Sequence, residues 1–271
     1  MIIKKGDIVG RKSYNSDILF KIDKIIETSK GKIALLKGIM IRIEADAPIE
    51  DLRIIEKDKV RTNIKILDDK IINKIKNLKT ENRNDEYIRI ATGKILHLDG
   101  DRKYSEKAKV YYKKMGLNAV VKNIPEYRQT QMIKELIRKY NPDILVITGH
   151  DGMIKKNTRY NDINNYRNSK YFINSVIEAR KVIPQEKDLV IFAGACQSFF
   201  EAIMESGANF ASSPARVLID FVDPIIVAQK VATTEEYKYV SMKEISNELE
   251  DGMKRVGGKG ARGKKKIKTI S

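Results

Sequence analysis

Over the first 60 residues, hydrophobic and polar positions follow a pattern typical of short β-strands. Runs rich in β-branched residues are separated by Gly, Asn, Ser and Lys, as in "GDIVGRKSY", "ILFKIDKII" and "KIALLKG". We therefore expect a small SH3-like β-barrel domain over residues 1–60. Residues 61–90 are polar and highly charged, and isoleucines recur within them at roughly helical spacing, which predicts a charged helical linker.

From residue 91 the chain alternates between apolar runs and amphipathic helical patterns. The runs "DILVI" and "DLVIF" are continuously apolar, as expected for strands covered on both faces. Strands that alternate with helices of about 10–15 residues imply right-handed crossovers and a parallel sheet. We predict an α/β domain over residues 91–235, a parallel-rich sheet flanked by helices, followed over residues 236–271 by a helix and a basic flexible tail.

Composition indicates the cellular location of the chain and limits the metal and cofactor sites that it can form. The formal net charge is +17, much of it in the tail, and Cys196 is the single cysteine. One cysteine forms no internal disulfide, which favours the reducing cytoplasm. The opening residues form no signal peptide, and no apolar run reaches the ~20 residues of a membrane helix, so no membrane partner is expected. One cysteine and two histidines cannot build a common structural zinc site, and we expect neither a metal nor a cofactor.

Two residues carry the candidate chemistry, because each follows one of the two central strands. His150 comes just after "ILVIT" and Cys196 just after "LVIFA", a separation of 196 − 150 = 46 residues. If the strands are neighbours, both side chains emerge at the same edge of the sheet, where functional groups gather in such folds. Cys196 would be the nucleophile and His150 the general base, with backbone N–H groups of Gly149, Ala195 and Cys196 as an oxyanion hole. A separation of about 50 residues between His and Cys is also found in caspases.

Several stretches resemble the YabG family of sporulation-specific cysteine proteases: "GKILHLDGD", "PDILVITGHDG", "YRNSKYF", "LVIFAGACQS" and "GANFASSP". The opening "KKGDIVGRKSY" resembles the amino end of that family. The resemblance implies a caspase- or clostripain-like peptidase with His150 and Cys196 as its dyad. It also implies cleavage after Arg, with Lys as an alternative, in spore coat and cortex proteins, in the mother-cell cytoplasm and at the spore coat. Lys and Arg residues in segment 57–85 and in the tail are candidate self-cleavage sites.

A preference for Arg requires an acidic S1 pocket, because a buried guanidinium needs a carboxylate partner. The acids expected at this edge of the sheet are ranked with Asp101 first and Asp99 second, followed by Asp151, Asp220 and Asp223. His97 lies inside a predicted buried strand and is interpreted as a core histidine.

Two other functions are weighed against the peptidase. A basic nucleic-acid-binding protein would use the barrel and the tail, but the chain has no tryptophan and little aromatic character on its basic stretches, which argues against nucleic acid. A structural spore-coat protein with an inactive α/β domain would leave the placement of both His150 and Cys196 unexplained.

Overall fold

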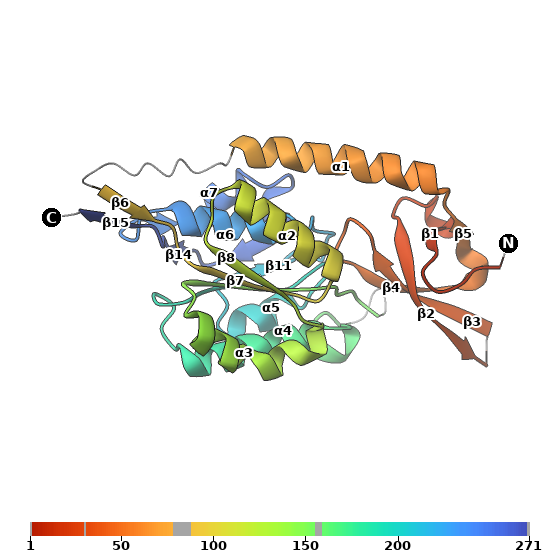
Figure 1. The fold of residues 1–271 in the computed structure, drawn as a ribbon. Coiled ribbons are helices and arrows are strands. Elements are labelled where there is room, and N and C mark those ends of the chain that lie inside the picture. Colours follow the sequence, from red (N-terminus) through yellow and green to blue (C-terminus); the bar gives the residue numbers. More distant parts are fainter. Residues whose placement is uncertain (1, 30, 78–87, 155–158, 270–271) are drawn as a thin grey trace.

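The chain is described here by a computed structural model covering residues 2–29, 31–77, 88–154 and 159–269 (Figure 1). A smaller β-sheet body at the N-terminal end lies against one edge of a larger α/β body, and a long helix runs along both (Figure 1). An α/β fold preceded by a β-rich N-terminal region is thus confirmed. None of the helices in the described ranges is long and apolar enough to cross a bilayer.

The N-terminal body is a five-stranded antiparallel sheet with the order β4-β3-β2-β1-β5. Alternating residues of its strands face one side, where Phe20, Ile22 and Leu36 are buried. Helix α1 (Lys57–Asn77) follows, and its Ile71 packs with Tyr111 of the α/β body. The elements are β1 (Ile8–Arg11), η1 (Lys12–Tyr14), β2 (Phe20–Thr28), β3 (Gly31–Gly38), β4 (Glu44–Pro48), η2 (Ile49–Asp51) and β5 (Leu52–Ile54).

The α/β body is built on a six-stranded sheet with the order β13-β11-β10-β9-β7-β8. All neighbours pair in parallel except β13, which runs antiparallel to β11. The sheet consists of β7 (Ile95–Asp99), β8 (Ala119–Asn123), β9 (Ile144–Thr148), β10 (Val190–Ala193), β11 (Phe210–Ser212) and β13 (Val256–Gly258). The remaining helices are α2 (Arg102–Lys114), α3 (Glu126–Tyr140), η3 (Ile163–Asn165), α4 (Ser169–Val182), α5 (Phe200–Glu205), α6 (Asp223–Thr233), α7 (Met242–Ser246) and η4 (Gly252–Lys254).

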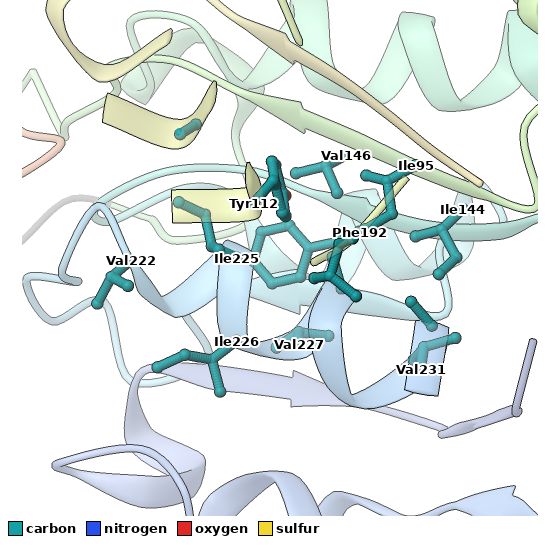
Figure 2. Packing of buried hydrophobic residues seen from close by; sticks show 14 of the residues in the cluster. Ile95, Tyr112, Ile144, Val146, Phe192, Val222, Ile225, Ile226, Val227 and Val231 are labelled. Carbon is teal, nitrogen blue, oxygen red and sulfur yellow. The ribbon is translucent and has the colours of Figure 1, made fainter. Parts of the chain in front are cut away.

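Each strand residue faces one of two hydrophobic layers. Ile144 and Val146 of β9 point toward α2 and α6, whereas Leu145 and Ile147 point toward α3, α4 and α5. Figure 2 shows the first layer, in which Phe192 of β10 lies among side chains of α6. Burial on both faces explains why the central strands are continuous apolar runs.

The C-terminal segment differs from the flexible tail expected from its sequence. It forms β13, then β14 (Ala261–Arg262), which pairs with β12 (Tyr239–Val240), and β15 (Lys266–Thr269), which pairs with β6 (Ile88–Ala91). Strand β13 covers the edge of β11, which would otherwise present unpaired backbone groups. The glycines here serve close packing, since a Cβ at Gly257 would lie 2.7 Å from the Phe200 ring.

The N-terminal sheet meets the α/β body at the carboxyl ends of the parallel strands. Its hydrophobic cluster, which contains Val9, Phe20 and Leu36, extends to Cys196 and Ile219 of the larger body. Isolated β-bridges join Ile41 to Asp220 and Ile43 to Asp151. The edge of the sheet that the sequence marks as functional is therefore covered by the N-terminal body.

Replacing Val256 tests whether β13 is part of the folded core. Val256 is fully buried, so Val256→Ala should lower the free energy of unfolding by about 2 kcal/mol, from two lost methyl groups and the cavity they leave. Met253→Ala is the matched control, because Met253 is 63% exposed. Equal stabilities of both variants in chemical denaturation would mean that the segment is a flexible tail after all.

Candidate active site

His150 and Cys196 occupy equivalent positions on neighbouring strands. Strands β9 and β10 pair in parallel with Ile147 opposite Ala193, and each of the two residues follows three positions later. Neighbouring strands lie about 4.8 Å apart, so the two loops emerge side by side. Both side chains are fully buried. The structure thus brings both sequence-predicted residues to one edge of the sheet.

Cys196 is held as a thiol in a sharp turn. Gly194 has a φ of +110° and Gln197 a φ of +55°, which reverses the chain between β10 and α5. The backbone N–H of Ile219 donates a hydrogen bond of 3.2 Å to Sγ. Burial raises the pKa of Cys196 to about 12, although the hydrogen bond from Ile219 opposes that shift. With the N-terminal sheet docked, the sulfur is therefore protonated near neutral pH.

His150 has one ring nitrogen bonded and one free. Its Nε2 lies 3.3 Å from the carbonyl oxygen of Gly38, and because a carbonyl only accepts, Nε2 carries the proton. Nδ1 is buried and has no hydrogen-bond partner among the described residues. The ring stacks on Tyr104 with centroids 5.5 Å apart. Burial lowers the pKa of His150 to about 4, so the imidazole is neutral and Nδ1 is available as a base.

Two carboxylates, Glu126 and Asp151, hold the loops that carry His150 and Cys196. Glu126, the first residue of α3, accepts a hydrogen bond of 2.8 Å from the backbone N–H of His150. Asp151 accepts hydrogen bonds from the Ser169 and Ser198 hydroxyls and from the backbone N–H groups of Gly152 and Asn168. Because Ser198 follows Cys196 by two positions, Asp151 joins the histidine loop to the cysteine loop. Asp151 was predicted as an S1 candidate, but its oxygens are occupied by these bonds.

Residues 38–43, which comprise the last residue of β3 and the loop leading to β4, are here named the arginine loop and lie between the loops that carry His150 and Cys196. Its ends meet through a hydrogen bond of 2.9 Å from the Gly38 N–H to the Ile43 carbonyl. The carbonyl oxygen of Arg42 lies 3.3 Å from the backbone nitrogen of Cys196 and 3.2 Å from that of Asp151. Two N–H donors, one from each catalytic loop, thus converge on one carbonyl oxygen.

The Arg42 side chain enters the α/β body and is fully buried. Its Nη1 lies 2.7 Å from Oδ2 of Asp99, and its Nη2 donates a hydrogen bond of 3.2 Å to the Phe221 carbonyl. The guanidinium also lies over the Tyr104 ring, 4.9 Å from its centroid. Burial favours the neutral acid, yet the Arg42 charge and the neighbouring His97 hold the pKa of Asp99 well below its usual range.

A buried chain of hydrogen bonds orients Asp99. Its Oδ2 accepts from the Thr148 hydroxyl at 3.0 Å, and Thr148 Oγ1 lies 2.8 Å from Nε2 of His97. His97 Nδ1 lies 3.1 Å from the Tyr112 hydroxyl. Burial lowers the pKa of His97, which keeps its ring neutral, although Asp99 opposes that shift. His97 is thus a hydrogen-bonded core residue that supports Asp99 indirectly.

The other predicted site residues have structural contacts. Asp101 caps α2 by accepting hydrogen bonds from the N–H groups of Lys103 and Tyr104. Asp223 is buried at the start of α6, where it accepts from the Asp220 N–H, and Asp220 pairs with Arg255 at 2.7 Å. Of the predicted oxyanion-hole donors, Cys196 donates its N–H to the Arg42 carbonyl and Ala195 donates its N–H to the Ser198 hydroxyl, while the second donor to the Arg42 carbonyl is Asp151. Gly149 packs closely, since a Cβ there would meet the Glu126 side chain.

Within the described ranges, no group of three or more His, Cys, Asp or Glu side chains gathers to hold a metal ion. The arrangement offers a thiol, a neutral imidazole with a free nitrogen, two convergent N–H donors and a buried carboxylate that holds a guanidinium. A thiol, an imidazole base and N–H donors for an oxyanion are groups that acyl transfer uses.

Asp151 should give folding stability a defined pH dependence. Burial raises its pKa from 3.8 to about 6, against four donated hydrogen bonds, so the folded protein binds a proton that the unfolded chain releases. The free energy of unfolding should therefore fall by about 3 kcal/mol as the pH rises from about 4 to 6. Asp151→Asn should remove that slope in denaturant titrations, while exposed Asp188→Asn should keep it. Identical slopes in both variants would contradict this assignment.

Comparison with known proteins supports a protease. The family described as YabG peptidase U57 matches residues 4–269. The chain is 39% identical over 277 residues to the sporulation-specific protease YabG of Bacillus subtilis (strain 168), covering 95% of this chain and 94% of that protein. No solved structure matches. Because the family match spans nearly the whole chain, including both bodies of the fold, the chain belongs to the YabG peptidase family and is a protease.

Proposed function

We propose that this protease is a cysteine endopeptidase that cleaves after arginine, with Cys196 as the nucleophile and His150 as the general base. One observation carries the proposal. The Arg42 carbonyl accepts hydrogen bonds from Cys196 and Asp151 while its side chain pairs with Asp99. An arginyl residue held in this way has its carbonyl oxygen on N–H donors from both the Cys196 loop and the His150 loop.

The proposed reaction starts from a neutral Cys196 thiol and a neutral His150 imidazole. Cys196 Sγ attacks the scissile carbonyl carbon as its proton moves to Nδ1 of His150, which Gly38 leaves unprotonated by binding Nε2–H. The N–H groups of Cys196 and Asp151 stabilise the oxyanion. His150 then gives the proton to the leaving amine, and water hydrolyses the thioester with His150 again as the base.

Specificity for arginine rests on Asp99 in this proposal. A planar guanidinium can pair with the carboxylate, donate to the Phe221 carbonyl and stack on Tyr104 at the same time. A lysine ammonium offers a point charge without the planar fork, so lysine should be a poorer P1 residue. We therefore favour Asp99 over Asp101 as the S1 acid, because the carboxylate of Asp101 is used to cap α2.

The biological role and fold family are also part of the proposal. The name of the Bacillus subtilis relative supports a role in sporulation. The family resemblance of the sequence adds to the proposal spore coat and cortex proteins as substrates, action in the mother cell and at the spore coat, and self-processing. We infer a caspase- and clostripain-like core from the parallel sheet with His and Cys after adjacent strands, and an SH3-like N-terminal sheet from its five short antiparallel strands. The family match favours a peptidase over a nucleic-acid-binding protein or an inactive coat protein.

A panel of fluorogenic peptides with Arg, Lys, Leu or Asp at P1 tests the reaction. We expect wild type to prefer Arg over Lys by at least about tenfold in kcat/KM and to leave Leu and Asp peptides uncut. Cys196→Ala and His150→Ala should each lower the Arg rate by about 1,000-fold or more. Cleavage that persists in Cys196→Ala would exclude this sulfur as the nucleophile.

A second comparison separates Asp99 from Asp101 as the S1 acid. Asp99→Asn is combined with Arg42→Gln, so that no buried arginine is left without its carboxylate partner. The double variant should lose roughly 100-fold or more in kcat/KM for Arg peptides relative to Arg42→Gln alone. Asp101→Asn in the same background should cleave normally, because asparagine also caps helices well. The reverse ranking would assign the pocket to Asp101.

A further inference from the structure

We propose that the peptide bond between Arg42 and Ile43 is a self-cleavage site, which the arginine loop holds in the active site of its own chain. This inference rests on the proposed function and deepens it, because it names the bond that the enzyme cuts in itself. Three independent features of the loop support it: its backbone pairing, its buried side chain and the state of the catalytic groups around it.

The backbone of the loop is bound as an extended peptide is bound at a sheet edge. Ile41 bridges Asp220 in an antiparallel sense, and Ile43 bridges Asp151 in a parallel sense. The Glu44 N–H donates a hydrogen bond of 2.8 Å to the Asp151 carbonyl just beyond the bond in question. Main-chain pairing of this kind is how extended peptides add to exposed edges in recognition. Main-chain contacts thus hold the segment on both sides of the Arg42–Ile43 bond.

The Arg42 side chain has no structural role within its own sheet. Among the described residues it reaches across to Asp99, the Phe221 carbonyl and Tyr104, all from the α/β body. Burying a guanidinium is costly unless a partner offsets the desolvation, and here that partner comes from the α/β body. An arginine in an acidic pocket, with its carbonyl on two N–H donors, has the arrangement proposed above for a substrate.

The catalytic groups are placed to act on this bond. Gly38, from the same loop, fixes the proton on Nε2 of His150 and leaves Nδ1 free. In the reaction, the Cys196 sulfur bonds to the Arg42 carbonyl carbon and the bond to the Ile43 nitrogen breaks. The thiol proton passes through His150 to that nitrogen. Water then adds to the thioester, which releases the Arg42 carboxylate and restores the thiol.

After the cut, the two fragments would stay associated, and the space around Cys196 and His150 would become accessible. Residues 1–42 end just beyond β3, and residues 43–271 begin just before β4. The two strands pair in register, with Leu36 opposite Ala45 and Lys37 opposite Glu44. The loop end at residues 39–42 would then be free to leave the cleft. By contrast, the α1 part of segment 57–85, also considered for self-cleavage, is helical, so its carbonyls are engaged within the helix.

Intact mass spectrometry and N-terminal sequencing of the purified full chain test the site. Wild type should yield fragments 1–42 and 43–271, the latter beginning at Ile43, whereas Cys196→Ala should stay intact. Arg42→Gln should remain uncut at this position and still cleave Arg peptides. Arg42→Lys, which keeps the buried charge, should slow the cut by at least about tenfold. The matched control Arg53→Gln, at an exposed arginine of the same sheet, should be processed as wild type.

The outcomes separate the two proposals. Wild type that cleaves Arg peptides but keeps the Arg42–Ile43 bond, or is cut elsewhere first, would overturn the self-cleavage site and leave the proposed function standing. Absence of peptide cleavage by folded wild type, together with an intact Arg42–Ile43 bond, would overturn the proposed function and the inference with it. Mixing intact Cys196→Ala with active Arg42→Gln should give no cut, because each loop sits in its own active site; rapid cutting would contradict cleavage within one chain.

Discussion

The buried ion pair between Arg42 and Asp99 is the interaction on which the arrangement of this protein depends. Each charge would cost several kcal/mol to bury alone, and removing one partner typically costs about 3–5 kcal/mol. At the end of β7, Asp99 is held by a hydrogen bond from Thr148, which in turn contacts His97. Its partner Arg42 comes from a loop of the N-terminal sheet. The pair therefore ties the two bodies of the fold together at the functional edge of the parallel sheet.

Docking of that loop also sets the protonation state of the catalytic groups. Both Cys196 and His150 are fully buried, and burial moves their pKa values in opposite directions, to about 12 and about 4. A neutral thiol and a neutral imidazole are suited to a single attack on the Arg42–Ile43 bond, which the arginine loop already holds in the site. Once the loop leaves, solvation should return both pKa values toward their ordinary range, where a thiolate forms more readily. The position of the arginine loop and the reactivity of the Cys196 sulfur are thus linked.

The sequence predicted what local patterns can encode. Continuous apolar runs predicted that β9 and β10 are buried strands. The structure shows that they are neighbours, and the residues that follow them, His150 and Cys196, lie at one edge of the sheet. Arg42 carries no local signal, because its contact with Asp99 spans 57 positions. The Asp151 N–H is a backbone donor, which composition cannot reveal. The sequence did not predict strand β13, because its glycines were interpreted as a sign of flexibility. In the structure, Gly257 and Gly258 pack closely against Phe200 and Phe210.

The rate at which iodoacetamide alkylates Cys196 tests most directly whether the ion pair holds the loop over the catalytic sulfur. The comparison uses His150→Ala, which keeps the chain uncut, with and without Arg42→Gln, and follows the adduct by intact mass at one pH. We predict slow alkylation of the single variant and alkylation at least about tenfold faster in the double variant, because loss of the pair frees the loop and exposes a more acidic thiol. Equally fast alkylation of both would contradict the account, since Cys196 would then be open to solvent regardless of Arg42.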